Sequence, residues 1–181
     1  MKELRGNLFE PQTYKPYIGV PDAICITTNG ALNKASESIM GKGCALEAKR
    51  AYPGVAKELG QKIKSFGNVT QIIRHSIRTN PSLVAFPVKR TGMHIKSRLD
   101  VVWHMAKRFK PGDFVPGWAL KADPVLIRES AMRLAALANQ HGWEKVVLVR
   151  PGCGAGTLRW DEVKPILEEY LDDRFFVITY N

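Results

Sequence analysis

The sequence has few cysteines, and their arrangement points to neither a disulfide framework nor a metal site. Cys25, Cys44 and Cys153 are odd in number and widely spaced, and none belongs to a C-x-x-C pair. The four histidines form no H-E-x-x-H motif and no zinc-type Cys/His spacing, and no Ser-His-Asp set stands out from the background. We therefore expect reduced thiols that pack in the core, and neither a metal nor a cofactor.

Long apolar runs are also missing. No stretch approaches the roughly 20 apolar residues that span a bilayer, and the N-terminus lacks the basic and apolar segments of a signal peptide. These absences predict a soluble, cytoplasmic protein with no membrane partner. Because the chain has 181 residues, 45% of them hydrophobic, it can bury one substantial core, and we expect a single domain over residues 1–181.

Acidic residues are scarce relative to basic ones. The chain has 27 lysines and arginines against 17 aspartates and glutamates, which gives a formal net charge of +10. This balance favours an anionic partner, such as a nucleotide or a nucleic acid bound through the basic surface. Since the basic residues are spread along the chain, a role in solubility alone is the simpler alternative.

Predicted strands and helices alternate along the chain. The pattern indicates strands over residues 23–28, 69–74, 82–88, 145–149 and 174–180, and helices over residues 44–52, 55–65, 97–109, 123–141 and 160–171. A turn at Thr79-Asn80-Pro81 makes the second and third strands neighbours. This order predicts an α/β fold, a three-layer α/β/α sandwich with a central mixed β-sheet.

Two glycine-rich loops follow predicted strands and precede predicted helices. Residues 29–43 end in a Gly-Lys-Gly sequence, and residues 151–156 read Pro-Gly-Cys-Gly-Ala-Gly. In this fold class ligands bind beyond the carboxyl ends of strands, where glycine loops and helix starts offer backbone N–H donors to phosphates. Neither loop is a Walker or Rossmann motif, because no Ser or Thr follows Lys42 and G-x-G-x-x-G is absent. Tight turns without a ligand are the alternative interpretation.

Four segments taken together resemble the macro domain, a module that binds ADP-ribose. The resemblance runs over about residues 4–176 and is similar in particular to the branch that contains the terminal ADP-ribose glycohydrolase and the antitoxin that removes ADP-ribose from DNA. It implies the macro domain fold, with ADP-ribose or ADP-ribosylated DNA or protein as the partner. The segments are DAICITTNG from Asp22, MGKGCAL from Met40, FPVK from Phe86 and RPGCGAGTL from Arg150.

Carried over to the matching positions, the resemblance implies a set of ADP-ribose-binding residues. Asn7 stands where the family often has the aspartate that accepts a hydrogen bond from the adenine amino group. Asn29 matches the asparagine that reaches the distal ribose, although a turn asparagine before Gly30 is an equal alternative. The two glycine loops match those that hold the pyrophosphate and distal ribose. The full set is Asn7, Leu8, Thr28, Asn29, Met40, Gly41, Lys42, Gly43, Cys44, Ala45, Pro151, Gly152, Cys153, Gly154, Ala155, Gly156, Thr157 and Leu158.

The resemblance assigns the chemistry to Lys89. In this branch a lysine at the end of the F-P strand attacks C1″ of the distal ribose or assists its departure, which requires a lowered pKa. We expect Arg90 and the general positive field to lower the pKa of Lys89, and Lys42 to face solvent. A surface lysine at a strand end is the alternative. The glycohydrolase has an aspartate where this chain has Gly156, whereas the DNA-directed antitoxin resembles this chain in having glycine.

Residues 91–117 look like an inserted segment that is longer than the family norm. His94, Trp103, His104 and the adjoining Trp118 would suit a lid or a nucleic-acid contact, and packing of the tryptophans in the core is the alternative. Our hypothesis is a hydrolase that removes ADP-ribose from DNA or protein. A non-catalytic reader of ADP-ribose and an ADP-ribose 1″-phosphate phosphatase remain as alternatives.

Overall fold

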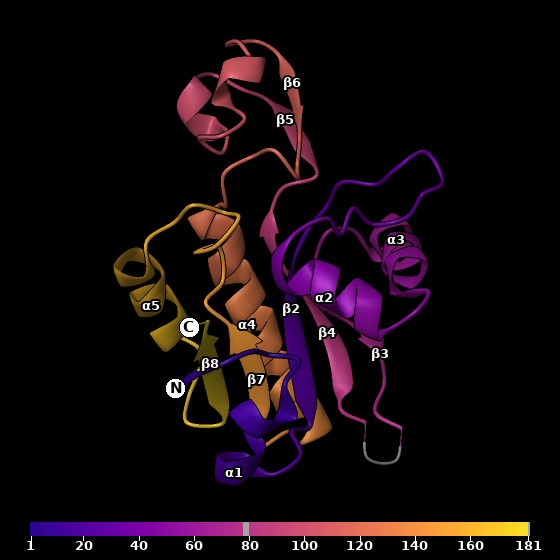
Figure 1. Ribbon diagram of the computed structural model, residues 1–181, viewed down its shortest axis with the longest axis vertical. Helices are drawn as coiled ribbons and strands as arrows, with labels where there is room; N and C mark the ends of the chain where they lie inside the picture. The colour runs from indigo at the N-terminus through magenta and orange to yellow at the C-terminus, as the bar shows by residue number, and fades with distance from the viewer. Residues whose placement is uncertain (78–79, 181) are drawn as a thin grey trace.

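A six-stranded mixed sheet forms the centre of the molecule (Figure 1). The computed structural model describes residues 1–77 and 80–180. The sheet has the order β1-β8-β7-β2-β4-β3; β3 runs antiparallel to β4 at one edge, and the other neighbouring pairs are parallel. The strands are β1 (Lys2–Arg5), β2 (Ala23–Asn29), β3 (Gln71–Arg74), β4 (Ser82–Lys89), β7 (Val146–Val149) and β8 (Phe175–Thr179).

Helices cover both faces of this sheet, so the predicted three-layer sandwich is confirmed (Figure 1). Along β2, Ile24 and Ile26 face one hydrophobic cluster, while Ala23 and Cys25 face the other. Because β4 and β7 are buried along their whole length, they read as continuous apolar runs, which is typical of parallel strands. The helices are α1 (Lys15–Ile18), α2 (Gly43–Ala51), α3 (Val55–Phe66), α4 (Pro124–His141) and α5 (Trp160–Glu168), and Pro11–Thr13, Arg98–Asp100 and Ala106–Arg108 form 3-10 turns.

Helix α4 begins and ends where its sequence signals indicate. The Asp123 carboxylate accepts a hydrogen bond from the Val125 N–H at 2.9 Å, and Pro124 occupies the first turn. The helix stops at Gly142, which adopts a left-handed conformation with φ 63°. No described helix is long and apolar enough to cross a membrane.

The predicted helix over residues 97–109 is wrong. Two short 3-10 turns stand there instead, at Arg98–Asp100 and Ala106–Arg108. The β-branched Val101 is extended, and the Val102 N–H donates to the Ala119 carbonyl at 3.0 Å, so this backbone pairs with a distant segment rather than with its own turn. The sequence reading also missed β1 and α1. The predicted turn at residues 79–81 includes Thr79, which lies outside the described residues, but β3 and β4 are neighbours as expected.

Residues 90–120 project beyond the carboxyl ends of β2 and β4 as a small lobe, which we call the lobe from here on (Figure 1). A hairpin of β5 (Gly92–His94) and β6 (Phe114–Pro116) supports it, and it has its own hydrophobic cluster around Val101, Val102 and Val115. Trp103 and Trp118 are 79% and 40% exposed, so they do not pack in the core as the alternative interpretation required.

We predict that the sheet-facing side of α4 carries much of the stability. Leu134→Ala removes a side chain with 0% exposure and should lower the free energy of unfolding by about 2–5 kcal/mol in urea titrations. Met132→Ala on the same helix is the control, because Met132 is 50% exposed and its loss should cost less than about 0.5 kcal/mol. Equal losses in the two variants would contradict this packing.

Candidate functional site

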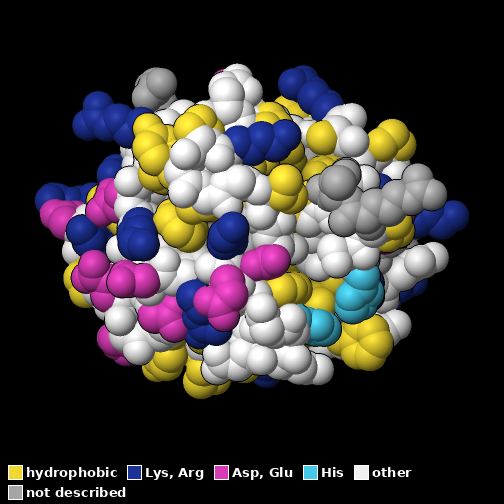
Figure 2. Space-filling model, turned by 90° about the horizontal axis from the view of Figure 1, so that it is seen from below, with side chains coloured by type: hydrophobic (Ala, Val, Ile, Leu, Met, Phe, Trp, Pro, Cys, Tyr) yellow, Lys and Arg dark blue, Asp and Glu magenta, His cyan; other side chains and the backbone are white. Residues whose placement is uncertain are grey.

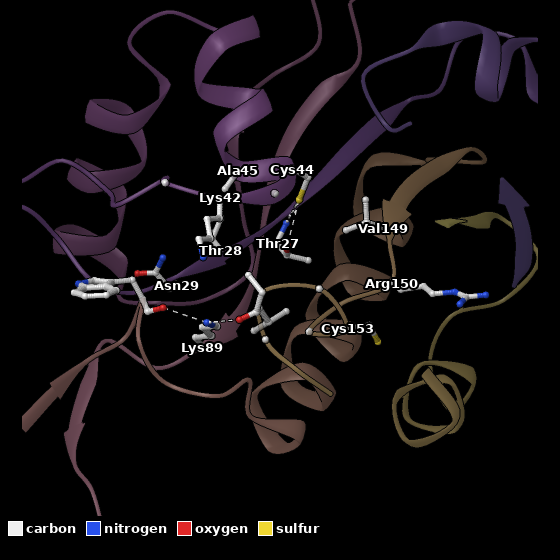
Figure 3. A pocket seen from close by; sticks show the side chains of 18 of the residues that line it. Thr27, Thr28, Asn29, Lys42, Cys44, Ala45, Lys89, Val149, Arg150 and Cys153 are labelled. Atoms are coloured by element: carbon white, nitrogen blue, oxygen red, sulfur yellow. Dashed lines mark hydrogen bonds between the residues drawn. The ribbon is translucent and has the colours of Figure 1, made fainter. Parts of the chain in front are cut away.

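A cavity of about 650 Å³ lies at the carboxyl ends of the strands, between the two glycine loops and the lobe (Figure 3). Its volume suits a ligand the size of a nucleotide. Several separate segments of the chain contribute to it, as expected for a site at the strand ends of an α/β sheet. Its lining comprises Thr27, Thr28, Asn29, Ile39, Gly41, Lys42, Gly43, Cys44, Ala45, Val88, Lys89, His104, Met105, Trp118, Val149, Arg150, Gly152, Cys153, Gly154, Ala155, Gly156, Ile178, Thr179 and Tyr180.

The first glycine loop presents the start of α2 to the cavity. Lys42 is the N-cap residue, but no described side chain caps the helix. Gly43 opens the helix with φ 57°, a left-handed conformation that favours glycine. The first N–H groups of an α-helix have no partner within the helix, and the helix dipole places partial positive charge beside them. This loop can therefore bind an anion.

The second glycine loop is held against the domain by close backbone approach. Gly152 has φ 74°, and its carbonyl accepts a hydrogen bond from the Leu158 N–H at 3.0 Å. A Cβ atom on Gly156 would lie 2.5 Å from the Gly152 carbonyl oxygen and 2.6 Å from the Ala122 Cβ. Because no side chain fits there, the aspartate that the glycohydrolase carries at this position has no room in this loop.

Lys89 is buried at the end of β4, with 6% of its surface exposed. Its ammonium donates to the carbonyls of Ala155 at 2.9 Å and Trp118 at 3.2 Å, drawn as dashed lines in Figure 3. A register shift between Thr28 and Asn29 pairs Asn29 with Lys89 across the two strands, and such irregularities re-aim side chains. Burial and the nearby charge of Lys42 lower the pKa of Lys89 to about 8.

The cation that lowers the pKa of Lys89 is Lys42, so the expectation that Arg90 would lower it is wrong. Arg90 forms an ion pair with Asp123 at 2.6 Å, so its charge is balanced. Lys42 is exposed, as expected, but it also borders the cavity, and its side chain extends toward the wall that carries Asn29 and Lys89 (Figure 3). Its Nζ lies 3.3 Å from the Nε2 of His104 in the lobe.

Asn29 and Thr28 both line the cavity. The polar atoms of the Asn29 side chain have hydrogen-bond partners, whereas the Thr28 hydroxyl has none among the described residues. The Asn29 side chain accepts from the Ala31 N–H and donates to the Ile39 carbonyl, each at 2.9 Å, so it fulfils the turn role weighed from its sequence. It lines the cavity as well. The Thr28 hydroxyl is buried in the cavity wall and has no partner among the described residues. A buried hydroxyl without a partner is costly, and a ligand would supply one.

Several predicted ligand-binding residues lie outside this lining. The Asn7 carbonyl oxygen accepts from the Phe9 N–H at 2.9 Å and thereby closes a local turn, and Leu8 is fully buried. Thr157 has φ 63° and shapes the loop behind the cavity. The residues of the predicted set that do not line the cavity are Asn7, Leu8, Met40, Pro151, Thr157 and Leu158.

Sequence reasoning named His104 and Trp118 as candidates for a lid but left them out of the ligand-binding set, and it missed Met105 and Tyr180. His104, Met105 and Trp118 reach the cavity from the lobe, and Tyr180 reaches it from the end of β8. The position of Tyr180 at the carboxyl end of the predicted strand over residues 174–180 was a signal that could have identified it, because this fold places ligands at such ends. No sequence signal distinguishes His104 from Trp103, which is directed to solvent.

The three cysteines lack the properties of nucleophiles. Burial raises the pKa of the Cys25 and Cys44 thiols, and it raises the pKa of Cys153 to about 11. The Cys44 sulfur, which lines the cavity, accepts a hydrogen bond from the Thr27 N–H at 3.3 Å. Since the thiolate is the reactive form, these residues are suited to packing and shaping the site. Among the described residues, no three His, Cys, Asp or Glu side chains form a group that could hold a metal.

The charged side chains of the cavity are basic. Lys42, Lys89 and Arg150 line it, and no carboxylate among the described residues does. The face opposite the lobe differs, because acidic and basic side chains are intermingled there (Figure 2). Arg150 turns away from the other side chains in Figure 3 to pair with Glu3 at 2.9 Å. The two lysines are therefore the cations best placed to attract an anionic ligand.

Comparison with solved structures identifies the architecture. The macrodomain of Thermus aquaticus DarG aligns with a TM-score of 0.66 at 21% identity, over 99% of this chain and 97% of its own length. The macrodomain of Mycobacterium tuberculosis DarG aligns with a TM-score of 0.63 at 20% identity, over 89% of each chain. This chain has the macrodomain fold. Family models and a search of curated proteins gave no match to the sequence.

A third solved structure that aligns with this fold contains a ligand. Thermosipho africanus DarTG in complex with ADP-ribose aligns with a TM-score of 0.61 at 16% identity, over 89% of this chain and 38% of its own length. Each of the three alignments covers 89% or more of this chain, so the shared fold extends over most of its length. The resemblance read from the sequence is thus supported at the level of the fold.

We predict that Gly156 tolerates no side chain. Gly156→Ala forces a Cβ into contact with Gly152 and Ala122, and the melting temperature should fall by several degrees, corresponding to about 1–3 kcal/mol. Gly154→Ala is the matched control in the same loop, because its Cβ would meet nothing within 4 Å. A Gly156→Ala variant as stable as Gly154→Ala in thermal unfolding would show that the loop is not tightly packed.

Proposed function

We propose that this macrodomain binds ADP-ribose in the cavity and removes it from a modified acceptor. The observation that carries the proposal is Lys89, a buried lysine with a lowered pKa at the wall of a basic cavity. An ordinary strand-end lysine would extend into water and keep its usual pKa. Lysines with lowered pKa values cluster at functional sites, and this one lies where the two glycine loops and the lobe meet.

The shape and charge of the cavity suit the two phosphates of ADP-ribose. The uncapped start of α2 at Gly43 and the pinned loop around Gly152 lie in the same cavity wall, so both can direct backbone N–H groups at a diphosphate. Lys42 adds a positive charge beside the first loop, and no described carboxylate lines the cavity to oppose an anion. Thermosipho africanus DarTG, part of which aligns with this fold, was solved in complex with ADP-ribose, which supports the choice of ligand.

Lys89 can act as a nucleophile at neutral pH. At about pH 7.4 a pKa of about 8 leaves about a fifth of these side chains neutral, against about one in a thousand for an ordinary lysine. The neutral amine would donate its electron pair to C1″ of the distal ribose, and the bond from C1″ to the acceptor would break. The acceptor leaves with the electron pair of that broken bond and takes up the proton that the lysine nitrogen loses, and water then hydrolyses the bond between the lysine nitrogen and C1″, which frees the amine.

Two other activities would use the same cavity without this chemistry. A non-catalytic reader would need the glycine loops but no neutral amine, and a phosphatase acting on ADP-ribose 1″-phosphate would attack phosphorus rather than C1″. The lowered pKa of Lys89 favours the hydrolase over both, because it makes the amine a nucleophile for carbon.

We predict that Lys89→Arg abolishes cleavage but keeps ligand binding, because arginine retains the positive charge and is never neutral in proteins. Release of ADP-ribose from ADP-ribosylated DNA, ADP-ribosylated protein and ADP-ribose 1″-phosphate should be measured by chromatography. The rate on the true substrate should fall about a hundredfold or more. Lys57→Ala, an exposed lysine on α3, should leave it unchanged. Full activity of Lys89→Arg would refute the lysine mechanism, and binding without cleavage by the wild type would favour the reader.

The rate should also depend on pH in a defined direction. Since only neutral Lys89 is nucleophilic, single-turnover rates should rise as the pH increases through about 8 and level off above it. A rate that falls over this interval would mean that the protonated form of Lys89 is the active one, acting on the leaving group instead.

We further propose single-stranded nucleic acid as the acceptor. The lobe beside the cavity exposes Trp103 and Phe114, at 79% and 58%. Its two carboxylates, Asp100 and Asp113, are occupied by backbone N–H donors of the lobe itself. Exposed aromatic rings and unopposed cations bind bases and phosphates respectively. Apart from Arg90, which is paired with Asp123, the basic residues of the lobe are Lys96, Arg98, Lys107, Arg108 and Lys110.

We predict that Trp103→Ala weakens binding of an unmodified single-stranded oligonucleotide about tenfold in fluorescence anisotropy, through loss of base stacking. Tyr17→Ala is the control, because Tyr17 is a similarly exposed aromatic residue (72%) on α1, at the end of the domain opposite the lobe (Figure 1). Affinity should also fall steeply with added salt. Equal affinity of wild type and Trp103→Ala would exclude the lobe as the acceptor site and favour a protein acceptor.

A further inference from the structure

A side-chain contact joins the lobe to the first glycine loop across the cavity. The Nζ of Lys42 lies 3.3 Å from the Nε2 of His104, although the two residues are 62 positions apart. Both side chains line the cavity. Lys42 belongs to the start of α2, whereas His104 belongs to the lobe, so the contact connects elements that nothing in the sequence links.

The chemistry of the contact fixes the roles of its two partners. A lysine ammonium has only donors, so Nε2 of His104 must be the acceptor, and the imidazole is then neutral with its proton on Nδ1. The contact leaves the charge of Lys42 in place. The contact restricts the position of the Lys42 ammonium, because a lysine side chain on a surface otherwise samples many positions.

Contacts within the lobe fix the position of His104. The next residue, Met105, is buried in the hydrophobic cluster of the lobe, and its N–H donates to the Val102 carbonyl at 2.8 Å. The rings of Trp103 and His104 meet edge to face with 5.6 Å between centroids. The lobe also supplies the Trp118 carbonyl that binds Lys89, so it contacts both lysines of the cavity.

We propose that His104 is a positioning residue: its imidazole accepts a hydrogen bond from Lys42 and thereby holds the Lys42 ammonium at the cavity that Lys89 also lines. This inference deepens the proposed function, on which its importance for turnover rests. Lys42 is then more than a phosphate ligand, and the lobe is a part of the chemical site rather than only a cover.

Apart from Lys42, the cations near Lys89 are paired with carboxylates, and the thiol and phenol groups of the cavity are neutral near pH 8. Arg150 is directed toward Glu3, and Arg90 is paired with Asp123. Cys44, Cys153 and Tyr180 have raised pKa values and stay neutral near pH 8. No carboxylate among the described residues lines the cavity. Lys42 is therefore the charge beside Lys89 that a change at His104 would displace.

The test is an NMR titration of Lys89 in the ligand-free protein, with lysine carbon-13 labelled at Cε and the Lys89 signal assigned by its loss in Lys89→Arg. The wild-type midpoint should lie at about 8. In His104→Ala it should rise by about half a unit or more, because Lys42 is released. His104→Gln should restore most of the wild-type midpoint, since its amide oxygen also accepts a hydrogen bond.

A double-mutant comparison separates positioning from a general effect. Lys42→Met should raise the midpoint at least as far as His104→Ala, and adding His104→Ala to Lys42→Met should change nothing further. An unchanged midpoint in His104→Ala, or a shift that persists without Lys42, would overturn the proposal. His104 is exposed, so these variants should fold as the wild type does. Because the readout needs neither ligand nor turnover, it can fail or succeed independently of the proposed hydrolase activity.

Discussion

The site is built around one buried ammonium group. Taking a charge out of water is costly unless hydrogen bonds compensate for it, and Lys89 finds two such bonds, to the carbonyls of Ala155 and Trp118. Each carbonyl comes from a different wall, the second glycine loop and the lobe. Lys89 therefore draws β4, the loop and the lobe together. These two hydrogen bonds offset only part of the cost of burying the charge. The remaining cost, together with the nearby charge of Lys42, lowers the pKa of Lys89 to about 8.

The glycines bring the backbone close enough for this arrangement. A Cβ at Gly117 would lie 1.9 Å from the Arg90 carbonyl oxygen, so the two ends of the lobe meet only because this residue has no side chain. Gly156 plays the same part within the second loop. Because the surrounding atoms leave no room for a side chain at either position, Gly156 meets a structural requirement of the loop.

Much of the fold follows from the sequence, because its strands and α4 carry strong local signals. Continuous apolar runs predicted β2, β4 and β7, and apolar residues at helical spacing predicted α4. The lobe did not follow, since Val101 and Val102 pair with a segment that is distant in sequence. The same limit applies to the site: the loops and Lys89 were predicted together, but the contact between Lys42 and His104 depends on tertiary structure.

The central claim is that the cavity between the two glycine loops is an ADP-ribose site, and calorimetric titration with ADP-ribose tests it most directly. The account predicts saturable binding of one ADP-ribose per chain, weakened when Lys42→Met removes the cation beside the first loop. Adenosine, which lacks the diphosphate, should bind far more weakly. Absence of heat with ADP-ribose, or equal affinity for adenosine and ADP-ribose, would contradict the account.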